Sequence, residues 1–295
     1  MDSPAEAPSL IARLRQRSAA LQAEAVAMRR RVPPVDMAWT TFEHDRTVSG
    51  NLIAGAVAFR LFVYLLPLYL LVLLTSGVVF SIDESAPRDL SEKAGVSSYL
   101  AGTIADASER SNQSIWILAP VTLYALASAG LAAHRTVATG HARAWEIPVP
   151  KARALVAVPA FLLFTIACIT VSFASARLRE DIFSPLVGLG SAAAYFALAL
   201  VAQRALPRAP GTTLRDLVPG ALLVAVGTVG LYWFNVLYLN KKVQSASEAY
   251  GALGIAATGL LWLYLIGRVL IAAPVLNATL WKRGDRSPAP HTPAS

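Results

Sequence analysis

The sequence predicts an all-α polytopic membrane protein with six transmembrane helices and one N-terminal interfacial helix. Apolar residues make up 55% of the 295 residues and charged residues only 15%, a composition shifted from that of soluble domains toward that of membrane proteins. The apolar residues fall in six runs, each close to the ~20 residues that a helix needs to cross a ~30 Å hydrocarbon core. The runs cover Leu61–Ile82, Ser111–Ala133, Ala154–Ala176, Ile182–Gln203, Leu217–Asn240 and Ala249–Gly267, and the last resumes after Arg268 as far as Trp281.

The basic residues outside the runs alternate between the two sides of the predicted membrane domain. The two terminal segments and loops 134–153 and 204–217 hold 17 lysines and arginines, whereas the other three loops hold 7. Cytoplasmic loops carry the excess of Lys and Arg, so both termini are predicted to be cytoplasmic. The net charge of +8 is therefore a topology signal, and we expect no nucleic-acid partner because the basic loops lack interleaved stacking aromatics.

The chain divides into a membrane domain between two tails. Residues 1–35 read as a basic cytoplasmic tail, with either a helix at Ser9–Arg31 or a partly ordered segment. Residues 36–282 form the predicted six-span domain, and residues 283–295, rich in Pro and Ser, are predicted to be disordered. We also expect a surface helix in the external loop 81–114.

A short amphipathic helix is predicted at 36–49, just before the first span. Trp39 and Phe42 would lie at the headgroup level, Asp36 would cap the helix, and Pro33-Pro34 would end the preceding segment.

Proline and glycine interrupt the predicted spans. Pro67 lies deep in the first span and is the candidate for a helix kink, because it frees a carbonyl near Val63 that needs a partner. The glycines of the last two spans permit either close helix packing or a hinge; they include Gly227, Gly230, Gly259 and Gly267.

Two stretches resemble the YihY/BrkB family of bacterial inner-membrane proteins. The first runs from Asn51 to Leu68, and the second is Tyr250-Gly-Ala-Leu-Gly followed by Leu261-Trp-Leu-Tyr-Leu and Leu276-Asn-Ala; Pro219-Gly-Ala adds to them. The resemblance implies six spans, cytoplasmic termini and a multi-pass protein of the bacterial cytoplasmic membrane. Members of this family carry virulence-factor, lipid-transporter or ribonuclease labels.

The chain departs from that family at two positions. Arg60 stands where members often have a tyrosine or another neutral residue, and Ala273-Pro274-Val275 stands where they often have Gly-Ala-Glu. A charge is gained in the first span and an acid is lost in the last, so no role of that glutamate transfers to this chain.

An enzyme is not expected. The four histidines offer no acid–base pair, and His134 and His141 read as solvated loop residues. The predicted cytoplasmic loops hold only Glu146 and Asp216 as carboxylates, too few for Mg²⁺-dependent hydrolysis. We expect no catalytic residue, no metal and no cofactor, because a lone Cys168 cannot build a metal site and no ATP-binding loop is present.

The candidate site rests on two arginines inside the first and last spans. Arg60 and Arg268 are each predicted ~13 Å from the cytoplasmic face, and a charge at the centre of a span costs up to ~3 kcal/mol. No Asp or Glu within a span is available to neutralise them. One way to lower this cost is for the side chain to snorkel to the headgroups, which Arg60 can do more easily than Arg268. The other is a cytoplasm-facing cavity that binds an anion or lipid, with four candidate neighbours: Asn51, Tyr64, Tyr264 and Asn277.

The resulting hypothesis is a transporter or flippase-like handler of an anionic lipid or envelope precursor. The alternatives are a non-transporting scaffold or lipid-binding accessory protein, and, least favoured, a membrane enzyme. Membrane lipids are the expected partners, and an oligomer is possible.

Overall fold

The computed structural model describes residues 33–82, 115–149, 151, 153–178, 184–235, 237 and 252–285. The expected helices at Ser9–Arg31 and in loop 81–114 lie outside these residues. The described part is all-helical, in the order α2 (Pro33–Thr47), α3 (Gly50–Ile82), α6 (Ile115–Ala144), α7 (Ala154–Leu178), α8 (Ser184–Ala205), α9 (Leu214–Phe234) and α11 (Ala252–Asp285). Six of these helices are long and apolar enough to cross a membrane, as the sequence predicts.

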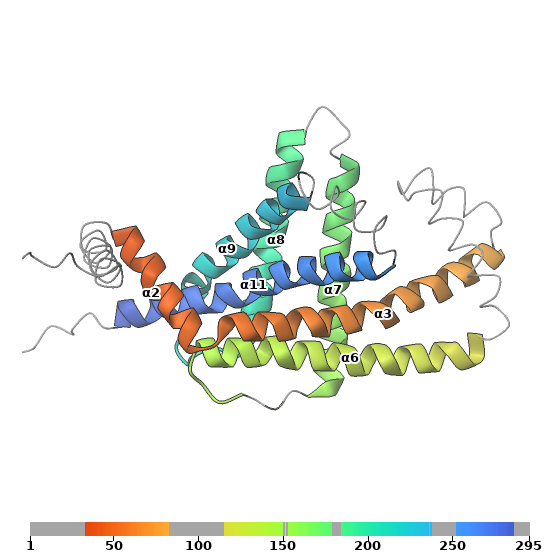
Figure 1. Cartoon of the computed structure of the whole chain (residues 1–295), viewed down its shortest axis with the longest axis horizontal. Coiled ribbons are helices and arrows are strands. Elements are labelled where there is room, and N and C mark those ends of the chain that lie inside the picture. The colour runs from red at the N-terminus through yellow and green to blue at the C-terminus, as the bar shows by residue number, and fades with distance from the viewer. Residues whose placement is uncertain are drawn as a thin grey trace, which may run out of the picture.

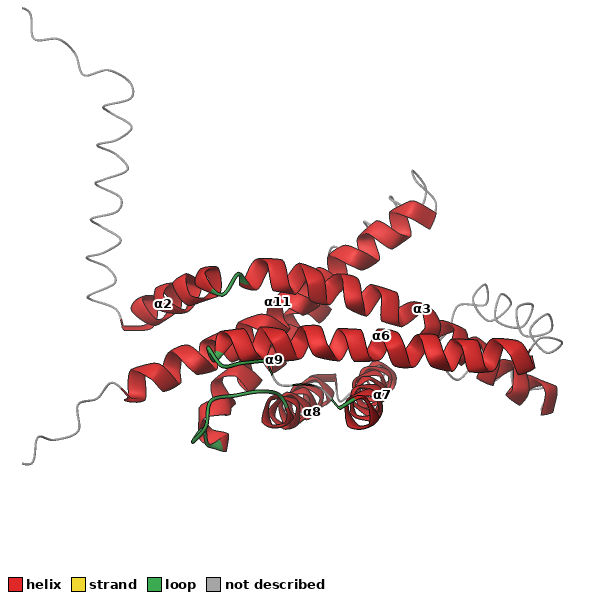
Figure 2. Cartoon of the chain, turned by 90° about the horizontal axis from the view of Figure 1, so that it is seen from below, coloured by secondary structure: helices red, strands yellow, loops and turns green. Residues whose placement is uncertain are grey.

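The six long helices pack in a closed ring. Each packs against the next along the chain, and α11, the last, packs on α3, the first. In Figures 1 and 2, α3, α6 and α11 run lengthwise beside one another, whereas α7 and α8 run steeply across them. The outward surface is apolar, with side chains such as Leu155 (92% exposed) and Ile117 (72%) fully presented. An exposed apolar surface of this extent belongs in lipid, and the chain is an integral membrane protein.

Small residues allow the closest helix crossings. A Cβ at Gly267 of α11 would lie 2.6 Å from the Ala54 carbonyl oxygen of α3, and one at Gly227 of α9 would lie 2.8 Å from Val269. Backbones can approach this closely only where no side chain intervenes. A Cβ added at Gly230 or Gly259 would meet no atom within 4 Å, so only part of the predicted glycine packing is found.

The amphipathic helix α2 begins earlier than predicted. Pro33 and Pro34 form its first turn instead of ending the preceding segment, because a proline at the first helical positions loses no intrahelical hydrogen bond. Asp36 is therefore inside the helix and is not its cap. Trp39 (45%) and Phe42 (55%) are exposed, as expected for an amphipathic surface helix. Pro67 lies inside α3, which continues as one helix to Ile82.

Candidate anion-binding site

Helix α6 continues beyond the predicted end of its span and carries two arginines with it. The uncharged run ends at Ala133, but the helix runs to Ala144, so Arg135 and Arg143 are helical residues and not members of a loop. The prediction of a solvated His141 is wrong for the same reason: the residue is 3% exposed, packed at the end of a helix. Hydropathy alone could not find this extension, since the polar residues after Ala133 end the uncharged run.

Helices α3 and α6 are antiparallel, and this brings Arg60 and Arg135 to one level. Gly140 of α6 lies against Ile53 of α3, and Gly130 lies against the ring of Tyr64. Between those two contacts, Arg60 on α3 falls opposite the turn of α6 that holds Arg135. Arg143 is eight residues further along α6, or about 12 Å toward the α2 end.

A pocket of about 380 Å³ lies between these two helices and collects the three arginines. Arg60 comes from α3, and Arg135 and Arg143 come from α6. The remaining lining is apolar or hydroxylic: Leu52, Ile53, Ala56, Ala132, Thr136 and Thr139. Within the described part of the chain, none of the three guanidinium groups pairs with a carboxylate. The pocket therefore concentrates positive charge with no acidic residue among its lining residues.

The depth of two of these charges makes the arrangement costly without an anion. Arg60 is ten residues from the start of α3, about 15 Å along the helix, and Arg135 is nine residues from the end of α6, about 14 Å. At mid-membrane a single arginine costs roughly 2.5–3.5 kcal/mol even on the lenient insertion scale, and such residues face cavities or partners. Two like charges at one level raise each other's energy further. An anion between them would lower both energies.

Arg268 is not part of this pocket, and it pairs with a carboxylate that lies outside the spans. Its guanidinium donates to Asp45 of α2 through both Nη1 (3.3 Å to Oδ1) and Nη2 (3.0 Å to Oδ2). The two side chains are 30% and 11% exposed, respectively. Bidentate pairing of this kind fixes geometry as well as charge. Asp216 of α9 instead caps its own helix through Thr213.

Two more predicted neighbours of Arg268 do lie beside it. Tyr264 lies one turn earlier on α11, and its hydroxyl donates a hydrogen bond to Asn51 Oδ1 of α3. Gly50 leaves the space that the Asp45 carboxylate occupies. Arg268, Tyr264 and Asn51 are thus brought together, but as a structural joint between α2, α3 and α11.

A second ion pair fastens the other end of α2. Arg283 of α11 donates to Asp36 Oδ2 at 2.7 Å and to Thr40 Oγ1 at 2.6 Å. His44 also contacts the Ala144 carbonyl oxygen at the end of α6 (2.9 Å). Because Asp36 pairs with Arg283 and Asp45 with Arg268, α2 lies antiparallel to the end of α11. We call this double attachment the α2 clamp.

Asn277 and Tyr64, the remaining candidates, are buried in packing contacts. Asn277 is fully buried, accepts a hydrogen bond from the Gly220 N–H of α9 (2.6 Å) and donates to Gln203 of α8. Tyr64 is 2% exposed and meets Phe161 edge-on, with ring centroids 5.2 Å apart. Val275, at the position of the family acid, is also fully buried.

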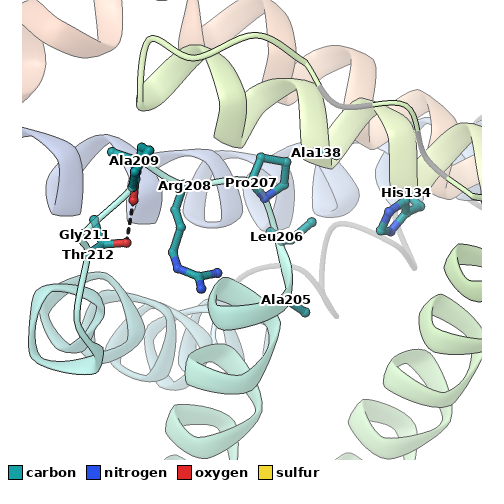
Figure 3. A pocket seen from close by; sticks show the side chains of 10 residues that line it. His134, Ala138, Ala205, Leu206, Pro207, Arg208, Ala209, Gly211 and Thr212 are labelled. Carbon is teal, nitrogen blue, oxygen red and sulfur yellow. Dashed lines mark hydrogen bonds between the residues drawn. The ribbon is translucent and has the colours of Figure 1, made fainter.

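A second pocket, of about 400 Å³, lies on another side of α6 (Figure 3). His134 and Ala138 of α6 form one wall, and the loop 206–212 after α8 forms the other. Arg208 donates to the Arg204 carbonyl oxygen of α8, and Thr212 donates to Ala209 (2.8 Å). The side chains of Arg208 and Thr212 are therefore turned to the backbone, and we consider this pocket a weaker ligand site than the arginine pocket.

The described residues contain no group of three His, Cys, Asp or Glu side chains placed to hold a metal ion.

Comparison with known proteins assigns the chain to a family of membrane proteins. The model of the Virulence factor BrkB family matches residues 41–295, and the chain belongs to this family, as the two sequence stretches indicated. No curated protein and no solved structure matches the chain significantly.

Proposed function

We propose that the protein binds the anionic headgroup of a membrane lipid in the arginine pocket and carries that headgroup across the bilayer. The observation that supports this proposal most is that Arg60, Arg135 and Arg143 line one open pocket without a carboxylate. We place the protein in the bacterial cytoplasmic membrane with the α2 end facing the cytoplasm, because the 17-to-7 bias of basic residues favours it.

The lining of the pocket favours an amphiphile over a small inorganic anion. Leu52, Ile53 and Ala56 form an apolar wall on α3, and Leu52 is 74% exposed. The hydroxyls of Thr136 and Thr139 donate to their own helix, at Ala132 and Arg135. Binding energy for the ligand must then come from the guanidinium groups at its charged end and from the apolar wall along its chain.

We also propose that no bond is made or broken in this cycle. The pocket lining contains no histidine, cysteine or carboxylate, which are the groups that supply most acid–base and nucleophilic catalysis. Binding and movement need only the charges and the apolar wall.

The test uses purified protein in vesicles that contain a fluorescent phosphatidylglycerol. We expect the wild-type protein to speed movement of the probe between leaflets, and Arg60→Leu to abolish most of that gain. Arg60→Lys, which keeps the charge, should retain part of it. Arg215→Leu is the matched control, because Arg215 is an exposed arginine on α9 outside the pocket. Equal rates for Arg60→Leu and Arg215→Leu would disprove the proposal.

A scaffold function is the second candidate, and the α2 clamp is the observation that favours it. The two ion pairs hold α2 in place with Trp39 and Phe42 exposed, which is a fixed surface for lipid or for another protein. Lipid binding that depends on Arg60 but occurs without movement between leaflets would favour this candidate over transport.

A further inference from the structure

The charge of the arginine pocket exceeds what an ordinary phospholipid can neutralise. Three guanidinium groups contribute three positive charges, and none of the lining residues that the structure describes is acidic. A single phosphodiester carries one negative charge, so the pocket would keep a net charge of two after binding it. Positive charges that stay unpaired repel one another, and a ligand with more negative charge fits the pocket better.

The three charges are also divided between two levels. Arg60 on α3 and Arg135 on α6 lie within one turn of the same level, which follows from the contacts of Gly130 and Gly140. Arg143 is two turns away along α6, about 12 Å at 1.5 Å per residue. One phosphate can accept hydrogen bonds from two guanidinium groups at one level, but a guanidinium two turns away calls for a second anionic group.

We propose that the ligand is a lipid that carries two separate phosphate groups, one bound between Arg60 and Arg135 and the other bound by Arg143. This inference rests on the proposed function and narrows its substrate class. The apolar wall at Leu52 and Ala56 lies on the α3 side of the same pocket and contacts the acyl chains. Thr139 lies between the two arginines of α6, one turn from each, and its hydroxyl is bonded to the Arg135 carbonyl oxygen (2.8 Å). The Thr139 hydroxyl therefore has no hydrogen left to donate to the linker between the phosphates.

The experiment compares two probes on the purified protein: phosphatidylglycerol, with one phosphate, and a cardiolipin, in which a glycerol joins two phosphates. Both are presented in neutral-lipid nanodiscs at the same total phosphate concentration. We expect the wild-type protein to bind the two-phosphate lipid on the order of tenfold more tightly, which corresponds to one additional charge-assisted contact.

The variants separate the two levels of the pocket. Arg143→Leu should weaken binding of the two-phosphate lipid more than it weakens binding of phosphatidylglycerol, so that the preference for two phosphates is lost. Arg143→Lys should keep most of the preference, and Arg60→Leu should weaken binding of both lipids. Arg143 is exposed, and a thermal unfolding curve that matches the wild type confirms that each variant is folded.

Two failures can be told apart. If the wild-type protein binds both lipids equally, or if Arg143→Leu weakens both by the same factor, the two-phosphate inference is wrong while the anionic-lipid site stands. If Arg60→Leu changes the binding of neither lipid, the proposed function itself fails, and this inference fails with it.

Discussion

At the scale of single residues, the Arg268–Asp45 pair changes what a substitution in the last span should do. An unpaired arginine in a membrane is a cost, so its removal would stabilise the protein. Arg268 instead forms a bidentate pair with Asp45, whose side chain is only 11% exposed. Removal of the arginine should therefore destabilise the protein. We expect Arg268→Leu to lower the free energy of unfolding by about 2 kcal/mol, because a largely buried carboxylate loses its partner.

The double variant tests this assignment. Asp45→Asn combined with Arg268→Leu should recover part of the loss, since no charge is then left unpaired. Chemical unfolding in detergent micelles gives the four free energies of the cycle. If Asp216→Asn recovers the stability lost in Arg268→Leu and Asp45→Asn does not, then Asp216 and not Asp45 is the partner of Arg268. A gain in stability on removing Arg268 would mean that the pair contributes nothing.

The sequence predicted the depth of Arg268 but not its partner. Depth follows from counting residues along one helix. The partner, Asp45, is 223 residues away along the chain and lies in a helix that was expected to rest at the headgroups. Asn277 shows the same limit: its position near the end of the last span was evident, but its bonds to Gly220 and Gln203 depend on how three helices pack.

At the scale of helices, the crossing of α11 over α3 depends on the absence of one side chain. A Cβ at Gly267 would lie 2.6 Å from the Ala54 carbonyl oxygen, a backbone atom that cannot rotate away. We expect Gly267→Ala to force the helices apart and to lower the free energy of unfolding by about 1–3 kcal/mol. Thermal unfolding in micelles measures it.

Gly259 supplies the matched control on the same helix. Nothing lies within 4 Å of a Cβ added there, so Gly259→Ala should be neutral or should stabilise α11 by up to ~1 kcal/mol through helix propensity. If both variants lose stability equally, the loss reflects glycine in general and not the close crossing.

The number and order of the long helices could be predicted from hydropathy, but their ends could not. The run that ends at Ala133 became a helix that ends at Ala144, and α11 passes through Arg268 without a break. In each case a basic residue interrupts the apolar pattern while the backbone remains helical. Arg135 and Arg143 were missed as site residues because no apolar run follows them, whereas Arg60 and Arg268 have apolar residues on both sides and were identified.

At the scale of the whole molecule, the closed ring places both ends of the membrane domain together. Arg283 near the end of α11 contacts Asp36 near the start of α2. This agrees with six crossings, which put both ends on one side of the membrane. The orientation that we propose from the bias of basic residues puts that end in the cytoplasm. In a Cys168→Ser background, we expect a cysteine at Thr212 to react with an impermeant reagent only from the cytoplasmic side.

A cysteine at Ser245, between α9 and α11, should react only from the opposite side. Labelling of intact cells reports the outer side, and labelling of inverted membrane vesicles reports the cytoplasmic side, so the comparison locates each cysteine. Reaction of the Thr212 variant in intact cells would reverse the proposed orientation and remove the cytoplasmic assignment of the α2 clamp.

The α2 clamp also has a consequence for the timing of synthesis. Asp45 is made first and Arg268 follows 223 residues later, which at a synthesis rate of about 5–20 residues per second is roughly 10–45 s. For that interval the ring is open and the carboxylates of α2 have no arginine from α11 to meet. Docking of α2 on α11 can therefore happen only after the last helix has been made, and the two ion pairs report that this helix is in place.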